Sequence, residues 1–84
     1  MTGNQPTVKD HRRDVLLAQR ESVMRLVAGA RAAHQASMTR AGLEWIHHTY
    51  RDAYRELADG YQNDVDRWAK RLDAVNAELA ALDV

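Results

Sequence analysis

The stretch "AGLEWIHHTY", residues 41–50, divides the sequence into two long segments rich in helix-forming residues. Gly42 indicates a break, because glycine is the residue most often found just past the end of a helix. A strong apolar pattern restarts directly after it, at Leu43. Two helices joined by so short a loop pack antiparallel, so this stretch predicts a helical hairpin with its turn near residues 41–43. A continuous helical rod through Gly42 is the alternative that the pattern leaves open.

The segment after the turn predicts one long amphipathic helix over about residues 43–82. Its large apolar residues fall within roughly 100° of one another on a helical wheel, and the opposite surface is charged. The spacing is coiled-coil-like, 3-4-3-4, from Leu43 to Leu57 and again from Trp68 to Leu82. Eleven positions separate Leu57 from Trp68, which indicates a hendecad-like insertion. The stripe comprises Leu43, Ile46, Tyr50, Tyr54, Leu57, Tyr61, Val65, Trp68, Leu72, Val75, Leu79 and Leu82.

The segment before the turn predicts a first helix over about residues 7–40. In "PTVKD", Thr7 is a suitable N-cap and Asp10 stands three places on, close to a capping box. Residues 1–6 are expected to be a disordered tail, so the single hairpin domain spans residues 7–84. A narrower apolar stripe follows the cap: Leu16, Val23, Val27, Ala30, His34, Met38 and Ala41.

The composition limits both stability and function. The chain has 84 residues, no cysteine, 12 basic and 12 acidic side chains and a formal net charge of zero. A domain this small is marginally stable by itself, and disulfides are excluded. Neutral overall charge argues against a nucleic-acid or membrane surface. Without a long apolar run, we expect a cytoplasmic protein, or a virion-associated one if phage-encoded. The Ala- and Arg-rich composition indicates a bacterial or phage source.

The apolar stripe of the second helix exceeds what the first helix can cover, which predicts a protein partner. The simplest partner is a second copy, giving a homodimeric helical bundle, and a larger protein assembly is the alternative. The tyrosines and Trp68 fit such a buried contact better than they fit base stacking. The expected partner-binding residues are Trp45, Tyr50, Tyr54, Leu57, Tyr61, Val65, Trp68, Leu72, Val75 and Leu79.

Several residues near the turn could bind a metal or take part in catalysis, but they do not form a complete catalytic or metal site. Glu44 and His47 have the Glu-x-x-His spacing of di-iron bundles, but the further inward carboxylates such sites need are missing. His47 and His48 would point about 100° apart on a regular helix. Arg40 and His47 match a spacing seen in some helical ribonucleases over two residues only. We therefore expect no catalytic, cofactor-binding or metal-binding residues, and no cofactor.

Three further features have two interpretations each. His34 is either a partly buried, hydrogen-bonded histidine, which is favoured, or a pH-sensitive element. The basic cluster "KDHRRD", residues 9–14, is better explained as a solvated helix end than as a phosphate contact. Trp45 points away from the stripe, so it either folds back over the corner between the helices or is an exposed binding anchor.

The sequence therefore predicts a non-enzymatic interaction or assembly protein: an adaptor, a structural subunit or a small inhibitor. A nucleic-acid-associated helical regulator is one alternative. The length, the central turn and the GC-rich-type composition resemble those of the secreted WXG100-like hairpins of type VII secretion, and this resemblance implies a secreted hairpin protein as the other alternative. The chain departs from that family, because its glycine precedes the tryptophan and Val65 stands where the export signal after Tyr61 has an acidic residue.

Overall fold

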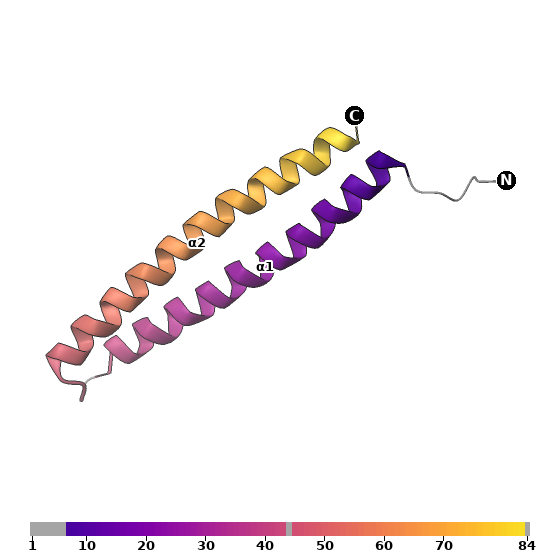
Figure 1. The fold of residues 1–84 in the computed structure, drawn as a ribbon. Helices are drawn as coiled ribbons and strands as arrows, with labels where there is room; N and C mark the ends of the chain where they lie inside the picture. The colour runs from indigo at the N-terminus through magenta and orange to yellow at the C-terminus, as the bar shows by residue number, and fades with distance from the viewer. Residues whose placement is uncertain (1–6, 44, 84) are drawn as a thin grey trace.

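The computed structural model describes residues 7–43 and 45–83 and contains two long antiparallel helices (Figure 1). Helix α1 spans Val8–Ala41 and helix α2 spans His48–Leu82. The connection closes one end of the pair, and the start of α1 lies beside the end of α2 at the other (Figure 1). The predicted all-α hairpin is confirmed and the continuous rod is excluded. The tail expected at residues 1–6 lies outside the described residues.

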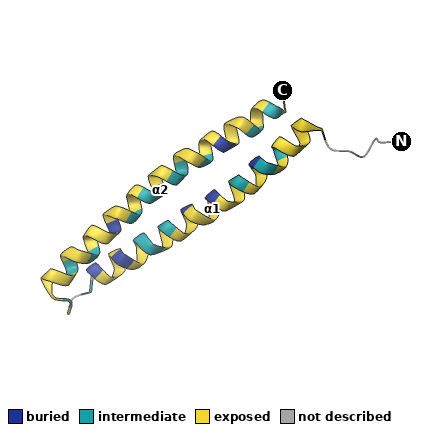
Figure 2. Ribbon diagram, in the orientation of Figure 1, coloured by how far each residue is buried: buried dark blue, intermediate teal, exposed yellow. Residues whose placement is uncertain are grey.

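The hairpin is elongated. Its radius of gyration is 19.5 Å, whereas a compact domain of this length has about 12 Å. Buried positions run in a line along the facing sides of the two helices, and the outer sides are exposed (Figure 2). Each helix therefore buries one stripe only, and the rest of its surface faces solvent.

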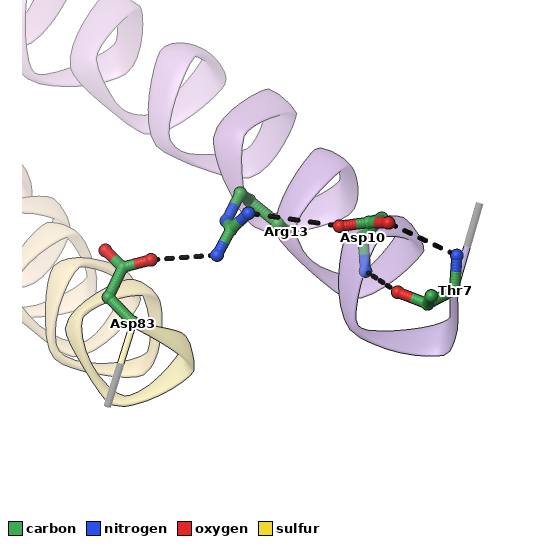
Figure 3. A network of polar contacts seen from close by, with 4 residues as sticks. All are labelled: Thr7, Asp10, Arg13 and Asp83. Atoms are coloured by element: carbon green, nitrogen blue, oxygen red, sulfur yellow. Dashed lines mark hydrogen bonds and ion pairs between the residues drawn. The ribbon is translucent and has the colours of Figure 1, made fainter. Parts of the chain in front are cut away.

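Helix α1 begins with the predicted capping box. The Asp10 backbone N–H donates to Thr7 Oγ1 at 3.1 Å, and the Thr7 backbone N–H donates to Asp10 Oδ2 at 3.3 Å (Figure 3). Two backbone donors that the helix itself leaves unpaired are satisfied in this way. The cap fixes where α1 starts.

The basic residues near this cap join the two helices. Arg13 donates to Asp83 at 2.8 Å (Figure 3), and Arg12 donates to Glu78 at 2.6 Å. The solvated helix end predicted for this cluster is thus correct in exposure but incomplete, because two arginines bridge to the end of α2. These pairs are half-exposed, so each contributes only about 0.2–1 kcal/mol. Their main effect is to fix how the open ends align.

The end of α1 lies where glycine indicated it, but the glycine does not act through a left-handed conformation. Gly42 follows the last helical residue, Ala41, with φ −84° and ψ −2°. Its N–H donates to Met38 O at 3.0 Å and to Thr39 O at 3.2 Å. A Cβ at this position would make only ordinary contacts, so the turn does not require glycine.

The second helix begins later than the sequence analysis expected, at His48 instead of near residue 43. His47 is extended, with φ −64° and ψ 142°, and its Nδ1 accepts the Thr49 N–H at 3.2 Å. Histidine therefore serves as the N-cap, a role usually filled by Ser, Thr, Asp or Asn. Because no preferred capping residue marks the start of α2, the pattern of apolar residues extended the predicted helix into the connection.

The buried seam of α2 has an unbroken 3-4 spacing and contains no hendecad-like insertion. Ala58 is fully buried, at 0% exposure, whereas Leu57 is 50% exposed. Sequence reasoning followed the larger residue and so displaced the seam by one position between Tyr54 and Tyr61. The positions turned toward α1 are Tyr54, Ala58, Tyr61, Val65, Trp68, Leu72, Val75, Leu79 and Leu82, all of them buried or half-buried.

On α1 too, a small residue is buried at the seam where the sequence analysis expected a larger neighbour. Ser37 is buried, and Met38, predicted in the stripe, is 47% exposed. Small residues thus occupy buried seam positions on both helices, Ser37 and Ala41 on α1 and Ala58 on α2. His34 Nδ1 lies 2.9 Å from the Ala58 carbonyl oxygen. A carbonyl oxygen only accepts, so Nδ1 carries the proton, and the favoured interpretation of His34 as a hydrogen-bonded, part-buried residue is confirmed.

Replacing Ala58 by leucine tests this register. Ala58→Leu forces three additional carbons into a filled seam and should lower the free energy of unfolding by about 1–3 kcal/mol. Ala77→Leu is the matched control, because Ala77 is exposed on the same helix, and it should change stability by less than about 0.5 kcal/mol. Urea unfolding followed by circular dichroism measures both. Equal effects of the two substitutions would contradict the assigned seam.

The capping box predicts a pH-dependent helix start. The Thr7 backbone N–H, then the Thr7 hydroxyl and the charges of Arg13 and Lys9, lower the pKa of Asp10 below its ordinary value of 3.8. The stabilisation is fully present above that ordinary value and is lost as the pH falls through the lowered pKa. Thermal melts should show Asp10→Ala less stable than wild type at neutral pH, with the difference vanishing in strong acid. A difference that persists in strong acid would show that the carboxylate is not responsible.

Candidate functional site

Two shallow grooves share one long side of the hairpin, which we term the Tyr61 side. One groove runs along α2, and the other lies between α1 and α2; Tyr61 and Asp64 line both. The apolar and small residues of this side are Leu26, Gly29, Ala30 and Ala33 on α1 and Ala53, Leu57, Gly60, Tyr61 and Trp68 on α2. The opposite long side, the Met24 side, has a groove lined by Met24, Val27, Ala28, Arg31, Ala69, Leu72 and Asp73.

The predicted partner-binding stripe is divided by the fold into three groups. Val65 and Val75 are buried at 7% and 0% exposure, so they belong to the hairpin's own core and are not a free surface. Trp45, Tyr50 and Leu57 are exposed. The remaining five residues, Tyr54, Tyr61, Trp68, Leu72 and Leu79, are half-buried along the seam. Only part of the stripe is therefore available to a partner.

Sequence reasoning missed the contribution of α1 to this surface. Leu26 is 45% exposed and lies in the groove with Gly29, Ala33 and Trp68. Had the buried position been assigned to Ala58 instead of Leu57, a helical wheel would have placed Leu57 and Gly60 beside the seam. The surface was thus missed because the register of the buried seam on α2 was assigned one position away, and not because the wrong types of residue were considered.

Gly29 and Gly60 lie inside the helices, and the hairpin gives neither a structural reason to be glycine. A Cβ built at either position meets no atom within 4 Å. Glycine in a helix interior is about 1 kcal/mol less favourable than alanine. Both glycines line the grooves of the Tyr61 side. This side therefore combines exposed leucines with backbone that another molecule can approach closely.

Aromatic residues gather at the turn. Two interpretations were predicted for Trp45, an exposed position or one folded back over the corner between the helices. Trp45 is 81% exposed, so the first interpretation is correct. His47 and His48 have ring centroids 4.2 Å apart, because His47 precedes the helix instead of lying on it. The earlier inference that the two rings diverge was wrong for this reason. His47 also lies edge-on to Tyr50, with centroids 6.4 Å apart.

The structure assembles no metal-binding cluster in residues 7–43 and 45–83: no three His, Asp or Glu side chains there are placed to hold an ion. His47 already uses Nδ1 to cap α2. The suggested Glu44 ligand lies outside the described residues. Arg40, considered with His47 for ribonuclease-like spacing, instead places its guanidinium 5.8 Å from the centroid of the Tyr54 ring. It thereby links the two helices near the turn.

Charge is divided between the helices although the chain is neutral. Helix α1 carries seven basic and three acidic residues, a net +4, and α2 carries five basic and seven acidic residues, a net −2. On the Tyr61 side, Arg25 lines the α1 edge, and Glu56 and Asp64 line the α2 edge. Arg25 pairs with Glu21 at 2.6 Å and Arg67 with Asp64 at 3.0 Å; Asp64 is half-buried and the other three residues are exposed. The Tyr61 side thus has a basic residue on its α1 edge and acidic residues on its α2 edge, with Arg25 and Asp64 each already in an ion pair within its own helix.

Within the part of the chain that the structure describes, neither helix has an apolar stretch sufficient to span a lipid bilayer. Compared with protein families, with curated proteins and with solved structures, the chain shows no significant match to any of them. The class of the protein is accordingly defined by the geometry of the hairpin alone. That geometry defines the chain as a two-helix hairpin with open apolar grooves along its sides.

The exposure of Trp45 can be measured by fluorescence. In Trp68→Phe the remaining Trp45 should emit at a wavelength close to that of indole in water, and acrylamide should quench it strongly. In Trp45→Phe the remaining Trp68 is half-buried, with Arg67 5.1 Å from its ring centroid. Its emission should be blue-shifted and its quenching weaker. Stronger shielding of Trp45 than of Trp68 would contradict the turn structure.

Proposed function

We propose that the chain is a non-enzymatic interaction or assembly protein that binds another protein through its Tyr61 side. The observation that supports this most directly is that exposed leucine side chains and glycines with open space around them lie on the same side of the hairpin. Leu26 and Leu57 are 45% and 50% exposed, and they flank two glycines that nothing in the hairpin approaches. Exposed apolar surface beside a groove is typical of protein–protein contacts.

The open shape of the grooves favours a binding role over catalysis. Catalysis needs a concave site that excludes water and brings reactive groups together. The grooves here are shallow and are lined mainly by Ala, Gly and Leu side chains, with carboxylates at the edge. An extended partner, such as another helix, fits such a surface better than a small substrate does.

The exposed aromatic residues at the turn extend the same proposal. Trp45 and Tyr50 are 81% and 64% exposed, and such amphipathic rings are effective anchors in protein interfaces. A nucleic-acid contact is less well supported. Although α1 is basic, three of its arginines, Arg12, Arg13 and Arg25, are in ion pairs with carboxylates.

Site-specific photocrosslinking in cells of the native source tests the proposed function. A benzophenone amino acid replaces Leu57 on the Tyr61 side, Met24 on the opposite side, or Ala77 on the outer surface of α2. All three positions are exposed, so the variants differ in direction and not in accessibility. We expect crosslinked protein adducts from position 57 and few or none from positions 24 and 77.

Two outcomes would overturn the proposal. Absence of adducts at all three positions would remove protein binding as the function of this surface. Adducts from position 24 or 77 that equal or exceed those from position 57 would assign the contact to another side. Gel migration and mass spectrometry report whether an adduct contains a second copy of this chain or a different protein.

A further inference from the structure

The chain exposes more surface than a compact monomer of its mass, and it is thin enough for a second hairpin to cover one of its long sides. The chain has an accessible surface of 6502 Å², whereas a compact monomer of 9.5 kDa exposes about 5,000 Å². The surplus of about 1,500 Å² per chain exceeds the roughly 800 Å² that each partner contributes to a standard-size protein interface. The smallest principal extent of the hairpin is 12 Å, which corresponds to a single layer of helices.

The charges of the two helices determine which pairing of copies is favourable. Placing α1 on the partner's α1 opposes two helices of net +4, and placing α2 on the partner's α2 opposes two of net −2. Placing α1 on the partner's α2 brings opposite charges together. On the Tyr61 side this pairing brings the edge that contains Arg25 toward the edge that contains Glu56 and Asp64.

We infer that the occupant of the Tyr61 side is a second copy of this chain, which rests on the function proposed above. The two copies are related by a two-fold axis that runs along the hairpin, so that each α1 lies on the partner's α2 in a four-helix bundle. Every contact then occurs twice, as a closed two-fold interface requires. Leu26 and Leu57 of each copy become buried, and both pairs of opposite-charge edges meet.

The axis also fixes which residues meet. A two-fold axis along the length keeps each residue at its own height, and His34 is level with Ala58 in the hairpin. Ala33 of one copy therefore lies within one residue, about 1.5 Å along the axis, of Gly60 of the other. Gly60 and Gly29 each have open space where a Cβ would stand. In the bundle this space is filled by the side chains and backbone of the second copy.

Mass measurement tests the association, and a leucine scan tests the surface. Sedimentation equilibrium should give twice the 9.5 kDa mass of one chain for wild type. The Cβ of Gly60→Leu meets nothing within 4 Å in its own hairpin, and leucine favours helix over glycine, so the helix content should be maintained or increased. It should nevertheless weaken dimerisation by about tenfold or more, because the added side chain overpacks the interface. Ala77→Leu, on the outer surface, should remain dimeric.

Crosslinking between single-cysteine variants tests the orientation. The chain has no cysteine, so Ala33→Cys and Gly60→Cys each carry one thiol. A short bis-maleimide should link a mixture of the two variants more efficiently than either variant alone. Preferential linkage of Gly60→Cys to itself would place α2 on α2 and overturn the proposed axis.

A chain that remains monomeric at all concentrations, and forms no crosslink, would overturn self-association. That result would leave the proposed protein-binding function intact if position 57 still yields adducts with a different protein in cells. Loss of those adducts as well would remove both proposals. The two sets of measurements thus separate failure of the partner from failure of the function.

Discussion

The hairpin depends on one line of contact between two helices. No third element covers either helix within the described residues, so each residue is either on this seam or exposed on at least one side. The size of the residues on the seam therefore determines two properties together. Small residues such as Ser37, Ala41 and Ala58 occupy buried seam positions, and the large neighbours Met38 and Leu57 consequently face outward. Tight packing inside and apolar surface outside have the same origin.

The architecture and the start of α1 could be predicted because their signals are local. The Thr7–Asp10 capping box depends on two residues three positions apart, and the structure contains both of its hydrogen bonds. The apolar repeat of the second half extends over ten turns, so a misassigned position does not alter the element it predicts. The start of α2 could not be predicted in this way. Its cap is the ring nitrogen of His47, and the stripe continues through the connection as Leu43 and Ile46 without a preferred capping residue.

The register and the charge pattern were missed because the sequence was interpreted by residue size and by overall composition. Leucine is a better core residue than alanine in isolation, so Leu57 was preferred to Ala58. The close approach of α1, which His34 marks with its hydrogen bond to the Ala58 carbonyl, reverses that preference. Similarly, a net charge of zero conceals a basic α1 and a more acidic α2. The polarity becomes apparent only when each helix is counted separately, and the pairs from Arg12 and Arg13 to the end of α2 follow from it.

The glycines, and not the charges, distinguish one long side of the hairpin from the other. Both long sides expose apolar residues, including Met24 on one and Leu57 on the other. Of the two sides, only the Tyr61 side has a glycine in the middle of each helix. A Cβ at either glycine would contact no other atom of the hairpin within 4 Å. A helix that contains such a glycine is less stable than its alanine equivalent, and nothing in the monomer offsets the loss. In the dimer that we propose, a second molecule packed against Gly29 and Gly60 would offset it through close backbone contact and burial of the adjacent leucines. The least favourable helix positions thus lie on the surface that we propose a second copy covers.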